Sequence, residues 1–306
     1  MSSAASTLTL VAGRARAVVV PAVGGSLASF TRDEREVLQS AASAALDGGD
    51  VLGMACYPLV PYSNRIAHGR LDFEGHTHLL AHSLAGVPHA IHGVGWQRPW
   101  QVAGAEASRV RLVLEHTGAG DAARQWPWPF RAEHELALVV DGDGVALVAS
   151  LAVENTGGSR FPCGLGWHPF FPRDPSTTLS FLAQGMWHND ETGLPLRCSR
   201  PEPWGFARPR TLAGVALDNV FAGWSGSAQL AAPARGLAIA LDASAACRHL
   251  VVYTPADGRS VAIEPVTHVT DAFNRAAQGE PDTGMQVLLP GARMSATLRI
   301  HAAPAR

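Results

Sequence analysis

The chain has 306 residues, of which 47% are hydrophobic and only 16% are charged. That composition provides enough apolar material for a sizeable core and excludes a disordered chain. The 24 basic and 26 acidic residues give a formal net charge of −2, which argues against nucleic acid or a membrane surface as a partner.

The N-terminal 20 residues predict a pair of strands instead of a secretory signal, because Arg14 and Arg16 interrupt the apolar stretch. No run approaches the ~18 uninterrupted apolar residues of a membrane-spanning helix. The four cysteines are scattered and form no CxxC pair: Cys56, Cys163, Cys198 and Cys247. This pattern favours reduced thiols in a cytoplasmic protein.

Along the chain, short apolar runs are bounded by Gly, Pro, Asp or Asn, which predicts antiparallel strands over more than two fifths of the residues. The clearest runs are 16–20, 109–115, 133–140, 145–153, 238–242, 250–253, 261–264 and 295–301. The Asp141-Gly142-Asp143-Gly144 turn predicts a tight hairpin between two of these strands. Segment 34–46 scores as a helix on propensity alone, although the strand-rich neighbourhood competes with it.

Turn-forming residues are spread over the whole chain, with 31 glycines and 21 prolines, so no linker or domain boundary stands out. We therefore expect an all-β protein in which residues 1–306 form one large antiparallel β-sandwich with long loops. Long loops in a compact domain usually carry function.

Unusual polar residues gather in four loop-like segments, 57–65, 90–93, 166–171 and 263–268. His168 stands among aromatic residues, where a core histidine bonded to backbone is an alternative to a functional one. Glu264 follows an apolar run, so a buried ion pair and a functional carboxylate are both open.

Thirteen histidines raise the question of a metal site, and His76 and His78 have the spacing of two ligands on one strand face. A solvated loop is the default interpretation, because the sequence has no HExxH motif. Dinucleotide, phosphate-loop and serine-hydrolase motifs are also absent. Proton transfer by His and Glu is the chemistry that remains.

Five segments, in order along the chain, resemble the aldose 1-epimerase (galactose mutarotase) family: NRIAHGRLDFEGHTHLL (64–80), IHG (91–93), GWHPFF (166–171), LDNVFAGW (217–224) and IEPVTHVTDAFN (263–274). The resemblance implies a single large β-sandwich, the galactose mutarotase-like supersandwich, with a sugar-binding groove. It also implies that no metal and no organic cofactor is needed. The residues after His168 (PFFPR) and after His92 (GVGWQRPW) depart from the family pattern, which weakens assignment of the sugar.

By the same resemblance, His168 is the catalytic acid and Glu264 the base that interconvert α and β anomers of an aldose. Arg65, His92 and Asp218 match the positions that hydrogen-bond the sugar. Trp96 or Trp224 could cover the apolar face of the ring, although ordinary packing explains them equally well. The partner is then a small sugar, and the protein a monomer or homodimer.

Two alternatives stay open. A hexose-6-phosphate 1-epimerase would use the same pair with additional cations, for which Arg65, Arg70, Arg98 and Arg173 are candidates. A non-catalytic carbohydrate-binding or regulatory module would not need both His168 and Glu264.

Overall fold

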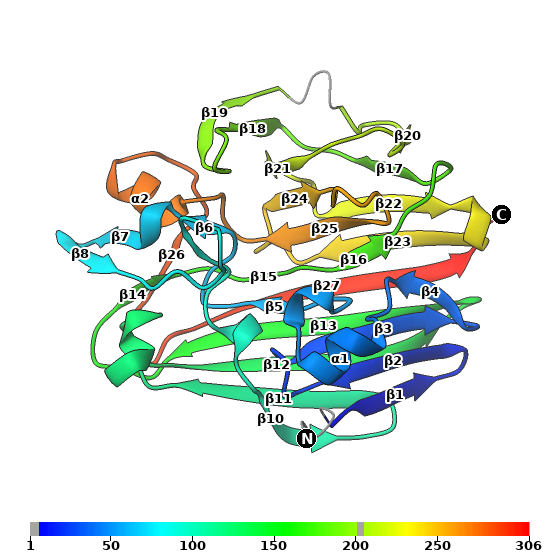
Figure 1. The fold of residues 1–306 in the computed structure, drawn as a ribbon, viewed down its shortest axis with the longest axis horizontal. Helices are drawn as coiled ribbons and strands as arrows, with labels where there is room; N and C mark the ends of the chain where they lie inside the picture. Colours follow the sequence, from blue (N-terminus) through cyan, green and yellow to red (C-terminus); the bar gives the residue numbers. More distant parts are fainter. Residues whose placement is uncertain (1–5, 201–204, 306) are drawn as a thin grey trace.

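A computed structural model of the protein describes residues 6–200 and 205–305. Strands account for 49% of it, and the helices are few and short, which confirms the predicted all-β fold. Two large antiparallel sheets dominate the molecule (Figure 1). No helix in the described part of the chain has the length and apolar character that crossing a membrane requires.

The larger sheet has nine strands. Their order is β10 (Gln101–Ala105), β11 (Arg109–His116), β12 (Phe130–Asp141), β13 (Gly144–Asn155), β27 (Arg293–Pro304), β23 (Leu237–Ala243), β22 (Ser227–Ala232), β17 (Thr178–Phe181) and β20 (Arg210–Thr211). The predicted hairpin is confirmed, since Asp141 of β12 pairs with Gly144 of β13. β27 comes last along the chain, yet it lies in the middle of the sheet, between β13 and β23.

The second large sheet has eight strands and carries the candidate site. Its order is β19 (Pro195–Ser199), β18 (Gly185–Asn189), β21 (Asp218–Ala222), β24 (His249–Tyr253), β25 (Ser260–Val266), β15 (Gly166–Trp167) and β5 (Pro58–Leu59), and β16 (Phe170–Pro172) also pairs with β25. Strands from both halves of the chain are therefore neighbours in this sheet.

Smaller elements surround the two sheets. β1 (Leu8–Ala12), β2 (Ala15–Val20), β3 (Ser26–Arg32) and β4 (Arg35–Leu38) form a four-stranded sheet, and β6 (Arg65–Ile66) pairs with β9 (Ala90–Ile91), β7 (Arg70–Phe73) with β8 (His76–Leu79), and β14 (Phe161–Cys163) with β26 (Gln286–Leu288). The helices are α1 (Ser43–Gly48), α2 (Ala272–Ala277) and the 3₁₀ turns η1 (Val51–Gly53), η2 (Ala67–Gly69), η3 (Gly95–Gln97), η4 (Gly120–Arg124) and η5 (Pro233–Arg235).

The helix propensity of segment 34–46 is mostly not realised, and the competing strands prevail over it. Residues 35–38 form strand β4, and only 43–48 are helical. Val37 and Leu38 are fully buried, and Leu38 pairs with Phe30 of β3. Burial against a neighbouring strand has overridden the helix propensity of this segment.

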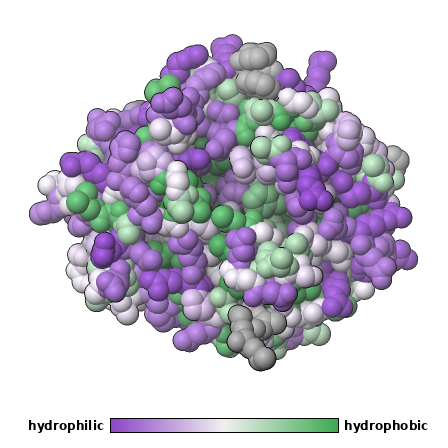
Figure 2. Space-filling model, in the orientation of Figure 1, coloured by the Kyte–Doolittle hydropathy of each residue, from purple (hydrophilic) through white to green (hydrophobic). Residues whose placement is uncertain are grey.

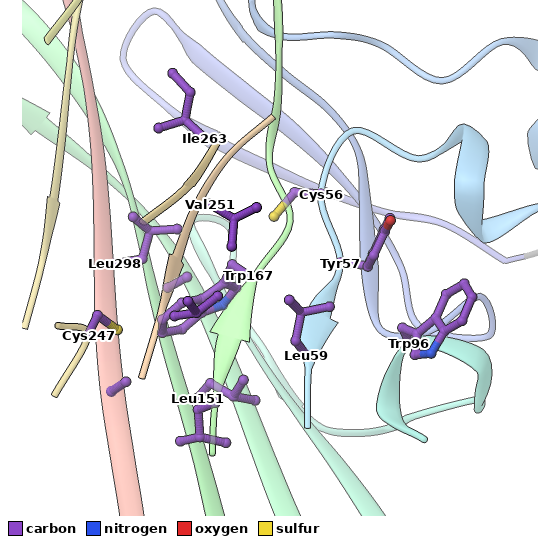
Figure 3. Close-up of a cluster of buried hydrophobic side chains, with 14 of the residues drawn as sticks. Cys56, Tyr57, Leu59, Trp96, Leu151, Trp167, Cys247, Val251, Ile263 and Leu298 are labelled. Atoms are coloured by element: carbon purple, nitrogen blue, oxygen red, sulfur yellow. The ribbon is translucent and has the colours of Figure 1, made fainter. Parts of the chain in front are cut away.

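The core fills the space between the two large sheets. Leu151 and Leu298 from the nine-stranded sheet belong to the same buried cluster as Trp167 and Ile263 from the eight-stranded sheet (Figure 3). Trp167 Nε1 also donates a hydrogen bond across the core to His134 Nε2, at 3.2 Å. The indole N–H is thereby satisfied inside the core, where an unpaired donor would be costly.

All four cysteines are free thiols, as their spacing predicted. Cys56, Cys163 and Cys247 are buried, and only Cys198 is exposed.

Candidate active site

A cavity of about 450 Å³ opens on the outer face of the eight-stranded sheet. The molecule is hollowed there, over β24 and β25 (Figure 2). All five residues predicted from the sequence line this cavity: Arg65, His92, His168, Asp218 and Glu264. The structure thus brings together segments that are up to 199 residues apart, from Arg65 to Glu264.

Strand register places the carboxylates on the cavity side. Asp218 of β21 pairs with Tyr253 of β24, and Tyr253 pairs with Ala262 of β25, so the three side chains share one face. Glu264 lies two residues further along β25 and therefore points to the same side. The intervening Ile263 points into the core, so this strand supports the core and the cavity at once.

His168 sits in the short segment between β15 and β16. Its backbone N–H donates to the Tyr57 carbonyl oxygen at 3.0 Å. Its ring packs against those of Tyr57 and Phe170, with centroid distances of 4.8 and 4.5 Å. Nε2 then lies 3.2 Å from Oε1 of Glu264. The aromatic rings fix the plane of the imidazole and direct its Nε2 at the carboxyl group.

Burial dominates the electrostatics of this pair, since His168 is 6% exposed and Glu264 only 2% exposed. Desolvation lowers the pKa of His168 to about 3. Desolvation, together with the charge of Asp218, raises the pKa of Glu264 well above its usual value. The pair therefore holds one shared proton and no net charge, and that proton can sit on Nε2 or on Oε1.

Arg65 and Asp218 form an ion pair at the edge of the cavity, with Nη2 3.0 Å from Oδ2. Nη1 of Arg65 also donates to Oδ1 of Asn64, at 3.1 Å. Asn64 has a positive φ of 55°, a conformation that asparagine adopts more readily than most residues. This backbone geometry folds the amide oxygen back onto the guanidinium.

His92 is held in one orientation by its Nδ1, which accepts the backbone N–H of Asn64 at 3.1 Å. Its ring meets that of His168 edge-on, with centroids 5.5 Å apart and planes at 84°. Desolvation, with the nearby His168 and Arg65, lowers the pKa of His92 well below its usual value. A neutral His92 with Nδ1 as an acceptor carries its proton on Nε2, which makes Nε2 a donor.

The suggested roles of Trp96 and Trp224 are wrong, because neither lines the cavity. Trp96 is 1% exposed and packs behind Tyr57, and its Nε1 donates to the Gly93 carbonyl oxygen. Trp224 is also buried, and its Nε1 donates to Ser227.

The aromatic rings that do line the cavity are Tyr57, Phe170 and Tyr253. No role was predicted for these three rings from the sequence. Tyr57 and Phe170 lie inside the loop-like polar segments 57–65 and 166–171, which was an available signal.

The arginines considered as phosphate ligands are largely occupied elsewhere, and only Arg65 lines the cavity. Arg70 pairs with Asp72, and Arg98 donates to Gln125. Arg173 donates to the backbone carbonyl oxygens of Gly258, Leu212 and Val215.

His76 and His78 lie on β8 of the β7–β8 hairpin, outside the cavity. The His78 ring packs on Trp128, with centroids 4.6 Å apart. Among the described residues, no three His, Cys, Asp or Glu side chains gather closely enough to hold a metal ion.

The fold is that of the galactose mutarotase-like sandwiches. A galactose mutarotase-like protein from Clostridium acetobutylicum superposes with a TM-score of 0.81 at 18% identity, covering 97% of this chain and 95% of the other. A protein of Escherichia coli K12 provisionally classed as an aldose 1-epimerase superposes with a TM-score of 0.86 at 26% identity, covering 98% and 99%. The E. coli K12 protein YphB, which is uncharacterised, is 30% identical over 84% of this chain and 87% of its own length.

The aldose 1-epimerase family profile matches residues 6–301. The chain belongs to the aldose 1-epimerase family. It is therefore an isomerase that acts on a carbohydrate, as the resemblance of its motifs implied.

Proposed function

We propose that the protein interconverts the α and β anomers of a free aldose, with Glu264 as the base and His168 as the acid. The observation that carries this proposal is the buried contact of 3.2 Å between His168 Nε2 and Glu264 Oε1, in a cavity large enough for one sugar ring. Two groups that share one proton can supply a base and an acid at adjacent atoms of the same substrate.

In the proposed reaction, Glu264 removes the proton of the C1 hydroxyl while His168 donates a proton to the ring oxygen. The bond between C1 and the ring oxygen breaks, and its electron pair stays with that oxygen. The open-chain aldehyde rotates about C1–C2 and the ring closes on the other face. Closure returns each proton to its donor, so neither residue is consumed and no cofactor is required.

Arg65, His92 and Asp218 are proposed to hold the sugar hydroxyl groups. Nε2 of neutral His92 is a donor, Asp218 is an acceptor, and Arg65 offers a forked set of donors. The ion pair between Arg65 and Asp218 fixes both groups before the sugar arrives, which reduces the entropy lost on binding.

The charges in the cavity favour a free sugar over a sugar phosphate. Among the described residues that line it, only Arg65 is cationic, against the carboxylates of Asp218 and Asp257, while the His168–Glu264 pair carries no net charge. The charge of Arg65 is already matched by Asp218. A phosphate group would therefore meet net repulsion in the described part of this site.

The test is to follow the optical rotation of freshly dissolved α-glucose, α-galactose, α-xylose, α-arabinose and α-glucose 6-phosphate with wild-type protein and two variants. Glu264→Gln keeps the shape of the side chain but cannot accept the C1 proton, so kcat should fall about a hundredfold or more, with a smaller change in KM. His168→Asn should behave alike, and the double variant should lose much less than the product of the two.

Glu106→Gln, an exposed substitution in the loop between β10 and β11, is the control and should keep wild-type rates. Near-native kcat of Glu264→Gln on every sugar that the wild type turns over would exclude Glu264 as the base. Binding of sugar without any turnover by wild-type protein would favour the non-catalytic module.

A further inference from the structure

The guanidinium group of Arg65 packs directly against the backbone of Gly193. Gly193, in the turn between β18 and β19, lies so close that a Cβ atom placed on it would be 2.6 Å from Cζ and 2.8 Å from Nε of Arg65. Its φ of +87° is also a conformation that side chains disfavour. Position 193 is therefore restricted to glycine for two independent reasons.

This turn is itself held rigidly by Asp190. The Asp190 carboxylate accepts hydrogen bonds from Thr192 N at 2.8 Å, Thr192 Oγ1 at 2.7 Å and Leu194 N at 2.9 Å. The backbone closes the turn as well, because Asp190 N donates to the Leu194 carbonyl oxygen at 2.8 Å. A turn fixed by four hydrogen bonds presents Gly193 at a defined place.

The ion pair between Arg65 and Asp218 needs such support because space lies on both sides of it. The two residues line the sugar-sized cavity and also a second, more open cavity of about 440 Å³ next to it, and Gly193 lines the second cavity. Without the backbone of Gly193 packed against it, the guanidinium could turn into the second cavity and leave the sugar site. Its Nε is buried and has no hydrogen-bond partner among the described residues, so Nε does not anchor it.

We propose that Gly193 is a positioning residue for substrate binding, which holds the guanidinium of Arg65 in the sugar cavity because it has no side chain. This inference rests on the proposed function of Arg65 as a sugar ligand. A Cβ at position 193 has to displace something, and the guanidinium is the movable neighbour, being the far end of a flexible side chain. Displacement separates Nη2 from Asp218 and misplaces the donors that meet the sugar.

The test compares Gly193→Ala with Gly279→Ala as the matched control. Gly279 has nearly the same φ, +85°, but a Cβ there meets no described atom within 4 Å. Both variants therefore carry similar backbone strain, and only Gly193→Ala touches Arg65. Gly193→Ala should raise KM by about tenfold with kcat changed less than about twofold, as expected for misplacing a charged donor. Gly279→Ala should keep the wild-type KM.

A double variant separates positioning from general damage. In an Arg65→Ala background, Gly193→Ala should change KM by less than about twofold, because the group that it displaces is gone. A full tenfold effect in that background, or an unchanged KM in the single variant, would overturn the proposal.

Crystal structures of wild type and Gly193→Ala give a reading that does not depend on turnover. The guanidinium should leave hydrogen-bond distance of Asp218 in the variant, and an undisturbed ion pair would overturn the proposal. If no sugar is turned over by wild type while the guanidinium moves as expected, the proposed function fails and the positioning by Gly193 stands.

Discussion

His168 and Glu264 differ from freely titrating side chains because water hardly reaches them. The pKa of His168 is lowered to about 3 and that of Glu264 is raised, in both cases mainly by desolvation. A second proton is therefore bound only when the pH approaches about 3, and the shared proton is lost only above the raised pKa of Glu264. Between these limits the pair keeps the single proton that the reaction needs.

The pH profile of kcat/KM should consequently be flat between about pH 5 and 6.5, where an exposed histidine would titrate. Initial polarimetric rates, corrected for spontaneous mutarotation at each pH, measure this profile. The alkaline limb should come from loss of the shared proton. An acid limb with its midpoint near pH 6.5 would show that His168 titrates as an exposed histidine does.

Arg65→Ala should act mainly on binding. The guanidinium touches bound sugar in the ground state and in the transition state alike, so its loss should raise KM about tenfold to a hundredfold with a small change in kcat. Arg70→Ala, in the β7–β8 hairpin outside the cavity, is the matched control. A fall in kcat with unchanged KM would assign Arg65 to the chemical step instead.

The residues of the cavity were predictable to the extent that each lies in a local motif. His168 and Glu264 have distinctive neighbours in sequence, and the motifs around Arg65, His92 and Asp218 follow the same family order. Tyr253 was out of reach, because its place beside Asp218 depends on the pairing of β24 with β21, about 30 residues earlier in the chain. Strand pairing of this kind is not encoded in either segment alone.

At the level of elements, a hairpin can be predicted from the sequence when its turn contains typical turn residues. The hairpin at 141–144 was predicted because Asp and Gly are typical turn residues. The hairpin between β3 and β4 was missed, because it turns on Asp33 and Glu34, which both have positive φ without a glycine. The helix propensity of the following residues then suggested a helix where β4 forms.

Gly142 is the residue that the first hairpin depends on. Its φ is +60°, and a Cβ there would meet nothing within 4 Å in the part of the chain that the structure describes, so Gly142→Ala adds strain without a clash. We expect Gly142→Ala to lower the free energy of unfolding by about 1–2 kcal/mol and the Tm by about 2–4 °C, with kcat and KM unchanged. Gly104→Ala, which also meets open space but lacks a positive φ, should leave Tm nearly unchanged. Equal Tm values for the two variants would show that the turn carries no strain.

At the scale of the whole molecule, buried histidines should make stability depend on pH. Desolvation lowers the pKa values of His134, His249 and His268 to about 4. In the unfolded chain they titrate near 6.5, so the unfolded state binds more protons between these values. Their contribution to the free energy of unfolding is complete above pH 6.5 and is lost as the pH falls toward 4. Between pH 7 and pH 5, each of these histidines should lower the free energy of unfolding by about 2 kcal/mol.

Urea unfolding at pH 7 and pH 5 tests this, and the midpoint should be clearly lower at pH 5. Glu264 and Asp271 oppose the trend in part, because burial raises their pKa values. His249→Gln should reduce the difference between the two midpoints, and His76→Gln, an exposed change, should not. Equal midpoints at both pH values in the wild type would contradict the assignment.

The central position of β27 in the nine-stranded sheet has a consequence for folding. β13 and β23 cannot be joined until residues 293–304 have been synthesised, because β27 lies between them. During synthesis both strands present open edges, which are templates for unwanted pairing with other chains. Insertion of β27 between β13 and β23 is therefore the step that completes the nine-stranded sheet. Chains released before residue 293 should aggregate instead of folding.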